Sequence, residues 1–249
     1  MIAVEMQSQV VMRLDKYLVD EGYFESRNRA LEAIKSGSVT VDKKRVKPST
    51  RVDHNSHIEI ADEKFFVSRA GRKLDNFLAE YTMELNDKKA LDIGSSTGGF
   101  AQILLERGVS SLTCVDVGSD QLHFSLREDS RVSLYEGQDI RDFEVKEEFE
   151  VITCDISFIS ILQVIDDIDR FTKASSDIII LYKPQFEVGR DIRRDSRGVV
   201  QDLDAIDKKR REFEAKARLL DWQLKYQSPS KIRGKEGNQE YLYHFQKSK

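Results

Sequence analysis

The chain has 249 residues, of which 39% are hydrophobic and 34% are charged, with a formal net charge of −4. That length and apolar content are enough for one large domain, or for a medium domain joined to a small one. The acidic balance excludes nucleic-acid binding through overall charge alone, so an RNA-binding surface has to be a local patch. No apolar stretch approaches the roughly 18 residues of a membrane span, and the N-terminus lacks the basic flank and apolar run of a signal peptide.

The two cysteines, Cys114 and Cys154, both lie inside apolar, strand-like runs, and their spacing is not that of a zinc site. We therefore expect buried, reduced thiols, no bound metal and a cytoplasmic location. Nothing in the sequence specifies an oligomer, so a monomer is the default expectation. Residues 1–11 precede the first helical pattern, and we interpret them as an extension or as the result of a start codon placed too far upstream.

The first part of the chain predicts a small α+β domain. Apolar residues recur at helical spacing within residues 14–19 and again within residues 30–34. Ser26 is placed to cap the second helix, and Gly37 to end it. Two short strands are expected after this helix, near residues 38–41 and 57–60.

This first part is also locally basic. Residues 12–52 hold ten Lys or Arg and six Asp or Glu, which gives +4 (ten minus six) in a chain whose net charge is −4. One interpretation is an ordinary solvated surface. The other is an RNA-binding domain over residues 12–60 whose cations contact phosphates. The candidate phosphate contacts are Arg13, Lys16, Arg27, Arg29, Lys35, Lys43, Lys44 and Arg45.

Residues 61–67 form a connector, and the pattern changes from residue 68 onwards. Apolar strand-like runs then alternate with amphipathic stretches, which predicts an α/β domain over residues 68–249 with a mostly parallel sheet and helices on both faces. The last two strands, expected at residues 223–227 and 241–245, favour a hairpin at the edge of the sheet. The other expected elements are strands at 90–93, 111–117, 132–135, 149–154 and 177–182, and helical stretches at 99–106, 159–171 and 203–220.

A glycine-rich loop follows the first strand of this domain. The strand ends in Asp92, then come Gly94 and the pair Gly98-Gly99, and a helix begins. Glycines let a backbone approach a ligand closely, and a helix N-terminus presents free N–H groups, so the arrangement suits an adenosyl cofactor. The spacing is neither that of a dinucleotide fingerprint nor that of a phosphate loop, and a structural turn without a ligand is the alternative. The candidate cofactor-binding residues are Asp92, Gly94, Ser95, Ser96, Thr97, Gly98, Gly99 and Phe100.

Two acids after the next strands extend this candidate cofactor site. Asp116 ends an apolar run about twenty residues beyond the loop, where an acid can bind both ribose hydroxyls of the cofactor. Asp139 follows the next strand and is placed to accept a hydrogen bond from the adenine amino group. An ordinary surface acid is the equal alternative for Asp139.

Four separated residues, each in a distinctive context, are the candidate catalytic set. Asp155 and Lys183 each follow an apolar run, so both should emerge at the carboxyl edge of the sheet, where ligands bind. Lys73 follows Ser68-Arg69-Ala70-Gly71-Arg72, and Glu240 precedes the last apolar run. Together with the loop, this set indicates methyl transfer from S-adenosylmethionine to a ribose hydroxyl of RNA.

The proposed chemistry explains why lysines and acids are needed together. A ribose hydroxyl is a weak nucleophile, and a general base has to assist it. A lysine acts as a base only when its amine is neutral, a form that burial and a neighbouring cation favour and neighbouring carboxylates disfavour. We assign Lys183 as the base, and Asp155, Glu240 and Lys73 as the residues that orient and tune it. Taken singly, each of the four could be an ordinary surface or ion-pair residue.

Other methyl-transfer chemistries fit these residues less well. Enzymes that methylate amino groups of bases usually carry Asn/Asp-Pro-Pro-aromatic after the fourth strand, where this chain has Asp155-Ile156-Ser157-Phe158. A covalent mechanism on a pyrimidine carbon needs an activated thiolate. Cys154 should point to the side of the strand opposite Asp155, and we expect it in the core.

These strings closely resemble the TlyA family, also called haemolysin A or FtsJ-like ribosomal-RNA methyltransferases. The resemblance runs from Arg13 to Phe245 and so covers nearly the whole chain. At the N-terminus, Arg13-Leu14-Asp15-Lys16-Tyr17-Leu18 and Ser26-Arg27-Asn28-Arg29-Ala30 are similar to an S-four-type RNA-binding domain. The strings of the catalytic part are Ser68-Arg69-Ala70-Gly71-Arg72-Lys73-Leu74, Asp92-Ile93-Gly94-Ser95-Ser96-Thr97-Gly98-Gly99-Phe100, Val115-Asp116-Val117-Gly118, Asp155-Ile156-Ser157-Phe158-Ile159-Ser160, Lys183-Pro184-Gln185-Phe186-Glu187 and Gly198-Val199-Val200.

The resemblance implies a Rossmann-like fold that uses S-adenosylmethionine for 2′-O-methylation of cytidine in ribosomal RNA. The partners that it implies are ribosomal RNA or ribosomal subunits, and no membrane. It also implies that a Lys-Asp-Lys-Glu tetrad is formed by Lys73, Asp155, Lys183 and Glu240.

Two departures from the family pattern bear on RNA contacts. Gln201 stands where the family has a basic residue, and residues 231–235 are unusually basic for the family. The alternatives to the enzyme are a non-catalytic RNA-binding protein and a membrane-active haemolysin. The first of these predicts a degenerate cofactor loop or a broken tetrad, and the sequence has neither.

Overall fold

The computed structural model describes residues 11–24, 26–53, 55–61, 66–189 and 191–248. The chain divides into two compact units, Met1–Phe65 and Phe66–Lys249, and each has a hydrophobic core of its own. Residues 1–10 of the expected extension and residues 62–65 of the expected connector lie outside the described residues.

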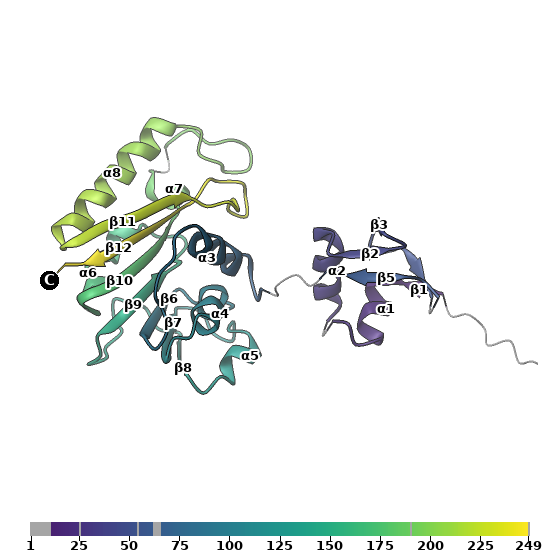
Figure 1. The fold of residues 1–249 in the computed structure, drawn as a ribbon. Coiled ribbons are helices and arrows are strands. Elements are labelled where there is room, and N and C mark those ends of the chain that lie inside the picture. The colour runs from purple at the N-terminus through teal and green to yellow at the C-terminus, as the bar shows by residue number, and fades with distance from the viewer. Residues whose placement is uncertain (1–10, 25, 54, 62–65, 190, 249) are drawn as a thin grey trace, which may run out of the picture. The chain divides into compact units, whose positions relative to one another are not determined.

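The N-terminal unit is a small α+β fold in which two helices pack on short strands (Figure 1). Helix α1 (Leu14–Asp20) lies against helix α2 (Arg27–Ser36). The strands form a three-stranded antiparallel sheet, β3 (Lys44–Arg45), β2 (Val39–Val41) and β5 (Ile58–Ile60), and an antiparallel pair, β1 (Met12–Arg13) and β4 (Arg51–Val52). The core is formed by Leu14, Tyr17, Leu18, Ala30, Ile34, Val39, Val41 and Val52.

The ends of α2 are those that the sequence predicted. The Ser26 hydroxyl accepts a hydrogen bond at 3.4 Å from the backbone N–H of Arg29, and so satisfies one of the free donors of the first turn. Gly37 ends the helix with a φ of +90°, in the left-handed region that favours glycine. The two expected strands are confirmed as β2 and β5.

Asp15 is a buried charge that ties this unit together. Its side chain is fully excluded from solvent and accepts hydrogen bonds from the guanidinium groups of Arg13, at 2.9 and 3.0 Å, and of Arg27, at 2.8 Å. The hydrogen bonds from Arg13 are the main reason that the pKa of Asp15 is lowered to about 2. The three side chains therefore join β1 and the start of α2 to α1.

Asp15→Asn should lower the free energy of unfolding of the N-terminal unit by about 2 kcal/mol at pH 7, because a neutral amide cannot balance two guanidinium charges. The folded pKa lies below the unfolded one, so the stability that the carboxylate contributes is complete above about pH 4 and is lost as the pH falls towards 2. Hydrogen exchange of the α1 and α2 amides in the full chain measures this loss. Asp20→Asn removes an exposed carboxylate 3.9 Å from Lys16 and is the control. Equal exchange rates in the two variants would contradict the role given to Asp15.

A seven-stranded sheet forms the centre of the C-terminal unit, with the order β11-β12-β10-β9-β6-β7-β8. Strand β12 is antiparallel to β10, and β11 is antiparallel to β12, whereas all other neighbours are parallel. This confirms the mostly parallel sheet and the edge hairpin. The bounds are β6 (Lys89–Ile93), β7 (Ser111–Asp116), β8 (Val132–Glu136), β9 (Phe149–Cys154), β10 (Thr172–Tyr182), β11 (Trp222–Pro229) and β12 (Tyr241–Lys247).

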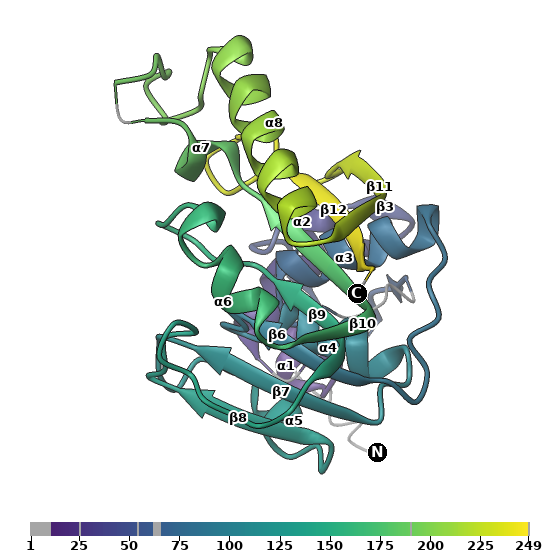
Figure 2. The same cartoon turned by 90° about the vertical axis from the view of Figure 1, so that its left-hand side faces the viewer.

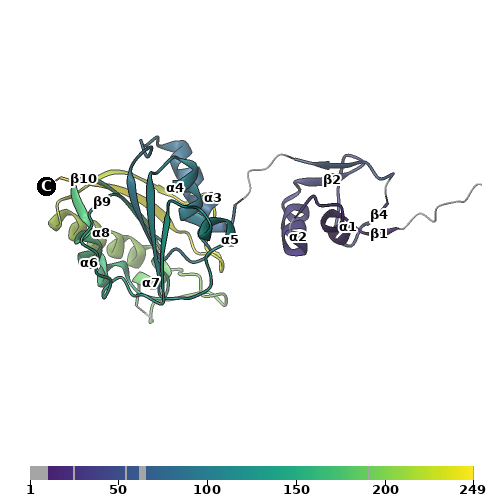
Figure 3. The same ribbon diagram turned by 90° about the horizontal axis from the view of Figure 1, so that it is seen from below.

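Helices cover both faces of this sheet, as two perpendicular views show (Figure 2, Figure 3). One face is covered by α3 (Arg69–Glu80), α4 (Gly99–Glu106) and α5 (Phe124–Arg127), and the other by α6 (Ile165–Asp169) and α8 (Leu203–Leu219). Each face has its own buried cluster: Leu74, Phe77 and Ile103 belong to the first, and Ile165, Phe213 and Trp222 to the second. The predicted Rossmann-like α/β architecture is therefore confirmed.

One predicted helix is shorter than expected. Instead of a helical stretch over residues 159–171, a 3-10 helix η1 (Ile161–Gln163) is followed by the short α6. Glu187, at the end of α7 (Pro184–Glu187), accepts hydrogen bonds from the Ser160 hydroxyl at 2.5 Å and from the first backbone N–H of η1 at 2.9 Å. This contact with a distant segment fixes where η1 begins, and hydrophobic periodicity cannot reveal it.

Both cysteines are buried and unpaired, as the sequence predicted. Cys154 lies in the same core cluster as Leu91 and Ile93. Burial raises the pKa of both the Cys114 and the Cys154 thiol. Neither is therefore a thiolate nucleophile near neutral pH, which agrees with the rejection of a covalent cysteine mechanism.

Candidate active site

The register of the sheet brings the predicted residues together at the carboxyl edge of the parallel strands. Ile93 of β6 pairs with Cys154 of β9, so the glycine-rich loop and Asp155 leave the sheet side by side. Strand β10 lies between β9 and β12. Its last residue pairs with the first residue of β12, which places Lys183 beside Glu240. Segments far apart in sequence thus meet at the edge where ligands bind in parallel α/β sheets.

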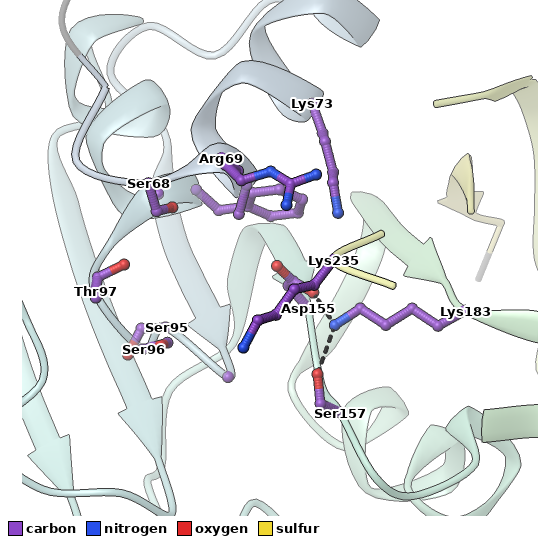
Figure 4. A pocket seen from close by; sticks show the side chains of 14 residues that line it. Ser68, Arg69, Lys73, Ser95, Ser96, Thr97, Asp155, Ser157, Lys183 and Lys235 are labelled. Carbon is purple, nitrogen blue, oxygen red and sulfur yellow. Dashed lines mark hydrogen bonds and ion pairs between the residues drawn. The ribbon is translucent and has the colours of Figure 1, made fainter. Parts of the chain in front are cut away.

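Two oxygens hold the Lys183 ammonium in the site. Lys183 Nζ lies 2.5 Å from Asp155 Oδ1 and donates a hydrogen bond to Ser157 Oγ at 2.8 Å (Figure 4). The side chains of Lys183 and Asp155 are 10% and 15% exposed, so water screens this pair weakly. The ion pair with Asp155 and the hydrogen bond to Ser157 together hold the lysine nitrogen in place.

A second lysine–carboxylate pair lies beside the first. Lys73 extends from α3, and its Nζ is 2.5 Å from Glu240 Oε2, with the two side chains 9% and 3% exposed. The other carboxylate oxygen of Glu240 accepts a hydrogen bond from Gln185 Nε2 at 2.9 Å. Glu240 therefore joins α3 to the segment that follows β10.

The site opens into a pocket of about 350 Å³, a volume within the range of small-molecule sites. The start of α3, the glycine-rich loop, the residues after β9 and β10, and the loop before β12 form its walls. Glu240 lies behind Lys73 and does not line the pocket. The predicted residues that do line it are Lys73, Gly94, Ser95, Ser96, Thr97, Gly99, Phe100, Asp155 and Lys183.

Two glycines allow α3 and α4 to approach each other at their N-terminal ends. A Cβ atom on Gly71 would lie 2.9 Å from the carbonyl oxygen of Gly99, and a Cβ atom on Gly99 would collide with the Ser68 hydroxyl. At these positions glycine serves the packing of protein on protein, in addition to the ligand approach that the sequence suggested. The close contact brings Ser68, Arg69 and Lys73 to the cofactor loop.

Asp92 is buried beneath the loop and does not line the pocket. Its Oδ1 accepts a hydrogen bond from the Thr153 hydroxyl at 2.6 Å, and its Oδ2 has no hydrogen-bond partner among the described residues. Burial raises the pKa of Asp92 to about 7. A cofactor contact for Asp92 stays a prediction, and from this position the contact would be indirect, through the loop that it supports.

The Asp92 carboxyl should make the stability of this unit depend on pH. Between an unfolded pKa near 3.8 and a folded pKa of about 7, the folded chain holds a proton that the unfolded chain has lost, so wild-type stability falls as the pH rises through this window. Asp92→Asn removes the group that titrates. The melting temperature of the variant minus that of wild type should therefore increase by several degrees between about pH 4 and pH 8. Trp222, the single tryptophan, reports on unfolding of this unit. Parallel pH profiles for the two proteins would contradict this account.

The two further predicted acids have different surroundings, and neither lines the pocket. Asp116, at the end of β7, is partly exposed beside the loop and accepts backbone hydrogen bonds from Ser96 at 2.8 Å and Gly118 at 2.7 Å. The carboxylate of Asp139 accepts a hydrogen bond at 2.6 Å from the guanidinium of Arg141. Their contacts with ribose and adenine stay predictions, and Asp139 would have to share its carboxylate with Arg141.

The predicted phosphate contacts of the N-terminal unit fall into two groups. Arg13 and Arg27 bind Asp15, and Arg45 donates a hydrogen bond to the carbonyl oxygen of Ser36 at 2.8 Å. The side chains of Arg13 and Arg27 are still 42% and 59% exposed, so both can also reach a phosphate. The remaining cations, all exposed except the partly buried Arg29, are Lys16, Arg29, Lys35, Lys43 and Lys44. Contacts of all eight with RNA stay predictions.

Sequence reasoning missed four polar side chains that line the pocket: Ser68, Arg69, Ser157 and Lys235. The first three belong to the strings that carry Lys73 and Asp155. Lys235 belongs to the stretch 231–235, whose basic character was noted without a place in the fold. In each case the sequence marked the segment but not the direction of the side chain.

The described ranges contain no group of three or more His, Cys, Asp or Glu side chains arranged to hold a metal ion. No helix in the described part of the chain is long and apolar enough to cross a membrane. Two lysine–carboxylate pairs, Lys183–Asp155 and Lys73–Glu240, meet at the pocket.

A parallel α/β sheet that ends in an antiparallel hairpin, with a pocket at its carboxyl edge beside a glycine-rich loop, places the C-terminal unit in the class of Rossmann-like methyltransferases. A family model described as FtsJ-like methyltransferase matches residues 66–247. A second model, described as S4 domain, matches residues 12–58.

Similar proteins narrow the class to one family. The 23S rRNA (cytidine-2′-O)-methyltransferase TlyA of Campylobacter jejuni is 44% identical over 256 residues, which cover 95% of this chain and 100% of that protein. The 16S/23S rRNA (cytidine-2′-O)-methyltransferase TlyA of Mycobacterium tuberculosis is 34% identical and covers 92% of this chain and 88% of its own. A solved structure from Streptococcus thermophilus, described as a hemolysin, is 30% identical with a TM-score of 0.71 and covers 96% of this chain and 89% of its own. The chain belongs to the TlyA (haemolysin A) family of FtsJ-like methyltransferases.

Proposed function

We propose that this protein transfers a methyl group from S-adenosylmethionine to the 2′-hydroxyl of a cytidine in ribosomal RNA, acting on ribosomal subunits in the cytoplasm. The observation that carries the proposal is the convergence of the Lys183–Asp155 and Lys73–Glu240 pairs on one pocket beside the glycine-rich loop. Membership of the TlyA family supports the same reaction and substrate, because the two TlyA proteins above carry this activity in their names.

The residues at the pocket fit the proposed methyl donor. The hydroxyls of Ser68 and Ser95 are buried without a hydrogen-bond partner in the described part of the chain, so both are available to a polar ligand. We assign the donor to the loop residues 94–100, with Asp116 at its ribose and Asp139 at its adenine. When bound, the donor supplies an electrophilic methyl group on a positively charged sulfur.

Lys183 is the proposed general base. As the ribose oxygen forms its bond to the methyl carbon, Lys183 Nζ takes the hydroxyl proton, and the electron pair of the broken carbon–sulfur bond stays on sulfur. The Asp155 carboxylate, 2.5 Å from Nζ, and the Ser157 hydroxyl, 2.8 Å from it, hold the lysine nitrogen in the pocket, where the ribose hydroxyl would be presented to it.

Phe158 is a candidate for holding the target base. Its side chain is 87% exposed, and it has a φ of +72°, a costly conformation for a residue other than glycine. Phe158 follows Ser157, which lines the pocket, and the centroid of its ring lies 5.3 Å from the centroid of the Phe186 ring. Residues held in strained backbone conformations cluster at active sites and ligand clamps. We infer that Phe158 stacks on the cytosine once that base has left the RNA stack.

Phe158→Ala should raise the KM for RNA about tenfold and change kcat little, because base–aromatic stacking contributes about 1–3 kcal/mol. Phe158→Tyr keeps the ring and should behave like wild type. Steady-state methylation at saturating donor measures both constants. An unchanged KM in Phe158→Ala would remove this residue from the account of substrate binding.

The function itself is tested by transfer of labelled methyl groups from S-adenosylmethionine to separated ribosomal subunits. The subunits are prepared from cells that lack this protein, so that the target is unmodified. We expect label in 2′-O-methylcytidine after digestion of the RNA to nucleosides, and the labelled subunit identifies the substrate. No label on either subunit, from a folded preparation, would favour the non-catalytic RNA-binding alternative, and label on a base would contradict the ribose assignment.

A further inference from the structure

The loop over residues 230–240 carries a lysine into the pocket. Lys235 lines the pocket opposite the start of α3, although it is remote in sequence from the other residues there. Figure 4 shows its side chain extending across the pocket towards the loop of Ser95 and Ser96, and away from Lys73. It therefore faces the end of the pocket that we assign to the methyl donor.

Contacts on two sides fix this loop in place. Arg69 donates a hydrogen bond to the carbonyl oxygen of Arg233 at 2.7 Å, and Lys231 pairs with Glu80 at 2.7 Å, so the loop is joined to both ends of α3. The backbone that carries Lys235 is consequently held against α3.

Gly234 sets the position of the backbone just before Lys235. A Cβ atom at Gly234 would lie 2.5 Å from Glu240 Oε1, so a larger residue here would displace the carboxylate that holds Lys73. The N–H of Gly234 also donates to the carbonyl oxygen of Asn238 at 2.9 Å. The lysine is thus aimed by a turn that is built against the catalytic pair.

Lys235 differs from the other two lysines of the pocket because no carboxylate of the described residues is paired with it. Lys73 is paired with Glu240 and Lys183 with Asp155, whereas Lys235 has no hydrogen bond or ion pair with any described residue. At the end of the pocket towards which it points, the Ser95 hydroxyl is buried, with the residue 5% exposed, and has no partner among the described residues. An unpaired cation and an unpaired hydroxyl facing one space form a site for an anionic oxygen group.

We propose that Lys235 binds the carboxylate of the amino-acid part of the methyl donor. This inference rests on the proposed function. The donor carries a sulfonium, an ammonium and a carboxylate. The carboxylate is its single anionic group and therefore the part that an unpaired ammonium binds most strongly, since the ribose and the adenine offer only neutral acceptors. A phosphate of the RNA is the rival partner, but the side chain points to the cofactor loop and not to Lys183, beside which we place the ribose.

The test measures equilibrium binding of S-adenosylmethionine and of its decarboxylated analogue to the full chain by calorimetry. Lys235→Met keeps the apolar stem and removes the charge. It should weaken binding of S-adenosylmethionine about tenfold and leave the affinity for the decarboxylated analogue unchanged. Lys235→Arg should bind both ligands like wild type. Lys225→Met removes an exposed lysine of β11 outside the pocket and should also bind like wild type.

Other results overturn the assignment in distinguishable ways. Equal weakening of both ligands by Lys235→Met would mean that the loop, and not the charge, supports the site. Unchanged donor binding with a raised KM for RNA would assign Lys235 to a phosphate of the substrate. A wild-type chain that binds neither ligand, even with ribosomal subunits present, would overturn the proposed function and this inference with it.

Discussion

Lys183→Met should lower the rate of methyl transfer to ribosomal RNA about a thousandfold while leaving donor binding nearly intact. General-base catalysis typically contributes a factor of about 10²–10⁴, and the methionine side chain cannot accept a proton. Lys183 lines the pocket and holds its nitrogen between Asp155 and Ser157, so the loss should appear in the chemical step. Single-turnover rates at saturating donor and RNA measure that step, and calorimetry with S-adenosylhomocysteine measures the binding that should survive.

Two matched variants test whether the site needs a general base at position 183 or only a positive charge there. Lys183→Arg keeps a cation next to Asp155 but remains protonated at any working pH, so it should be nearly as inactive as Lys183→Met. Lys173 lies on the same strand β10, is 42% exposed and pairs with Glu150 at 3.6 Å at the opposite end of the sheet. Lys173→Met should therefore keep full activity. A Lys183→Arg variant with wild-type rates would show that the site needs a positive charge here and not a base.

The sheet could be predicted from the sequence because its strands are buried on both faces and therefore appear as continuous apolar runs. Strand β10, for example, ends in seven buried residues, and the polar Lys183 marks where the chain leaves the sheet. Parallel strands deliver their last residues to one edge, so the meeting of Asp155 and Lys183 followed from the order of elements. The position of Glu240 beside Lys183 depends on the register of β12 as well. Periodicity did not give that register, and Glu240 was assigned to the site through the family resemblance.

The parts that could not be predicted depend on contacts between segments distant in sequence. The position of Lys235 at the pocket depends on the contact of its loop with Arg69, which no local sequence pattern predicts. The short η1 depends on Glu187, which lies beyond the next strand. The same holds for Asp15, whose two guanidinium partners include one twelve residues away. In each case the residue types were visible, but the three-dimensional partner decides whether a charge is free, paired or buried.

The Lys73–Glu240 pair differs from Lys183 in that it contributes to the stability of the folded unit as well as to the site. Both of its side chains are almost fully buried, and Glu240 also holds Gln185 and lies against Gly234. Removal of one partner leaves the other as a buried charge without compensation, which typically costs about 3 kcal/mol or more. Removal of both replaces an ion pair by neutral groups, and such replacements are often close to neutral for stability. Stability and catalysis can therefore be separated at this pair.

We expect Glu240→Gln and Lys73→Met each to destabilise the C-terminal unit by about 3 kcal/mol, and the double variant to recover most of that loss. Methyl transfer should fall at least about a hundredfold in all three, because the double variant restores neither the cation nor the anion of the pair. Urea unfolding followed by the fluorescence of the buried Trp222 measures the stability of this unit, and single-turnover methylation measures the chemistry.

The exposed pair Lys216–Asp166, at 2.6 Å, is the matched control. Lys216→Met, Asp166→Asn and their double variant should each change stability by less than about 1 kcal/mol and leave the rate unchanged, because water screens an exposed ion pair. If the losses in the Lys73 and Glu240 variants simply add, the two charges are not coupled in the folded chain, and the short contact between them does not stabilise it. If the double variant recovers activity together with stability, the pair acts only by holding α3 against β12, and the catalytic step depends on Lys183 and Asp155 alone.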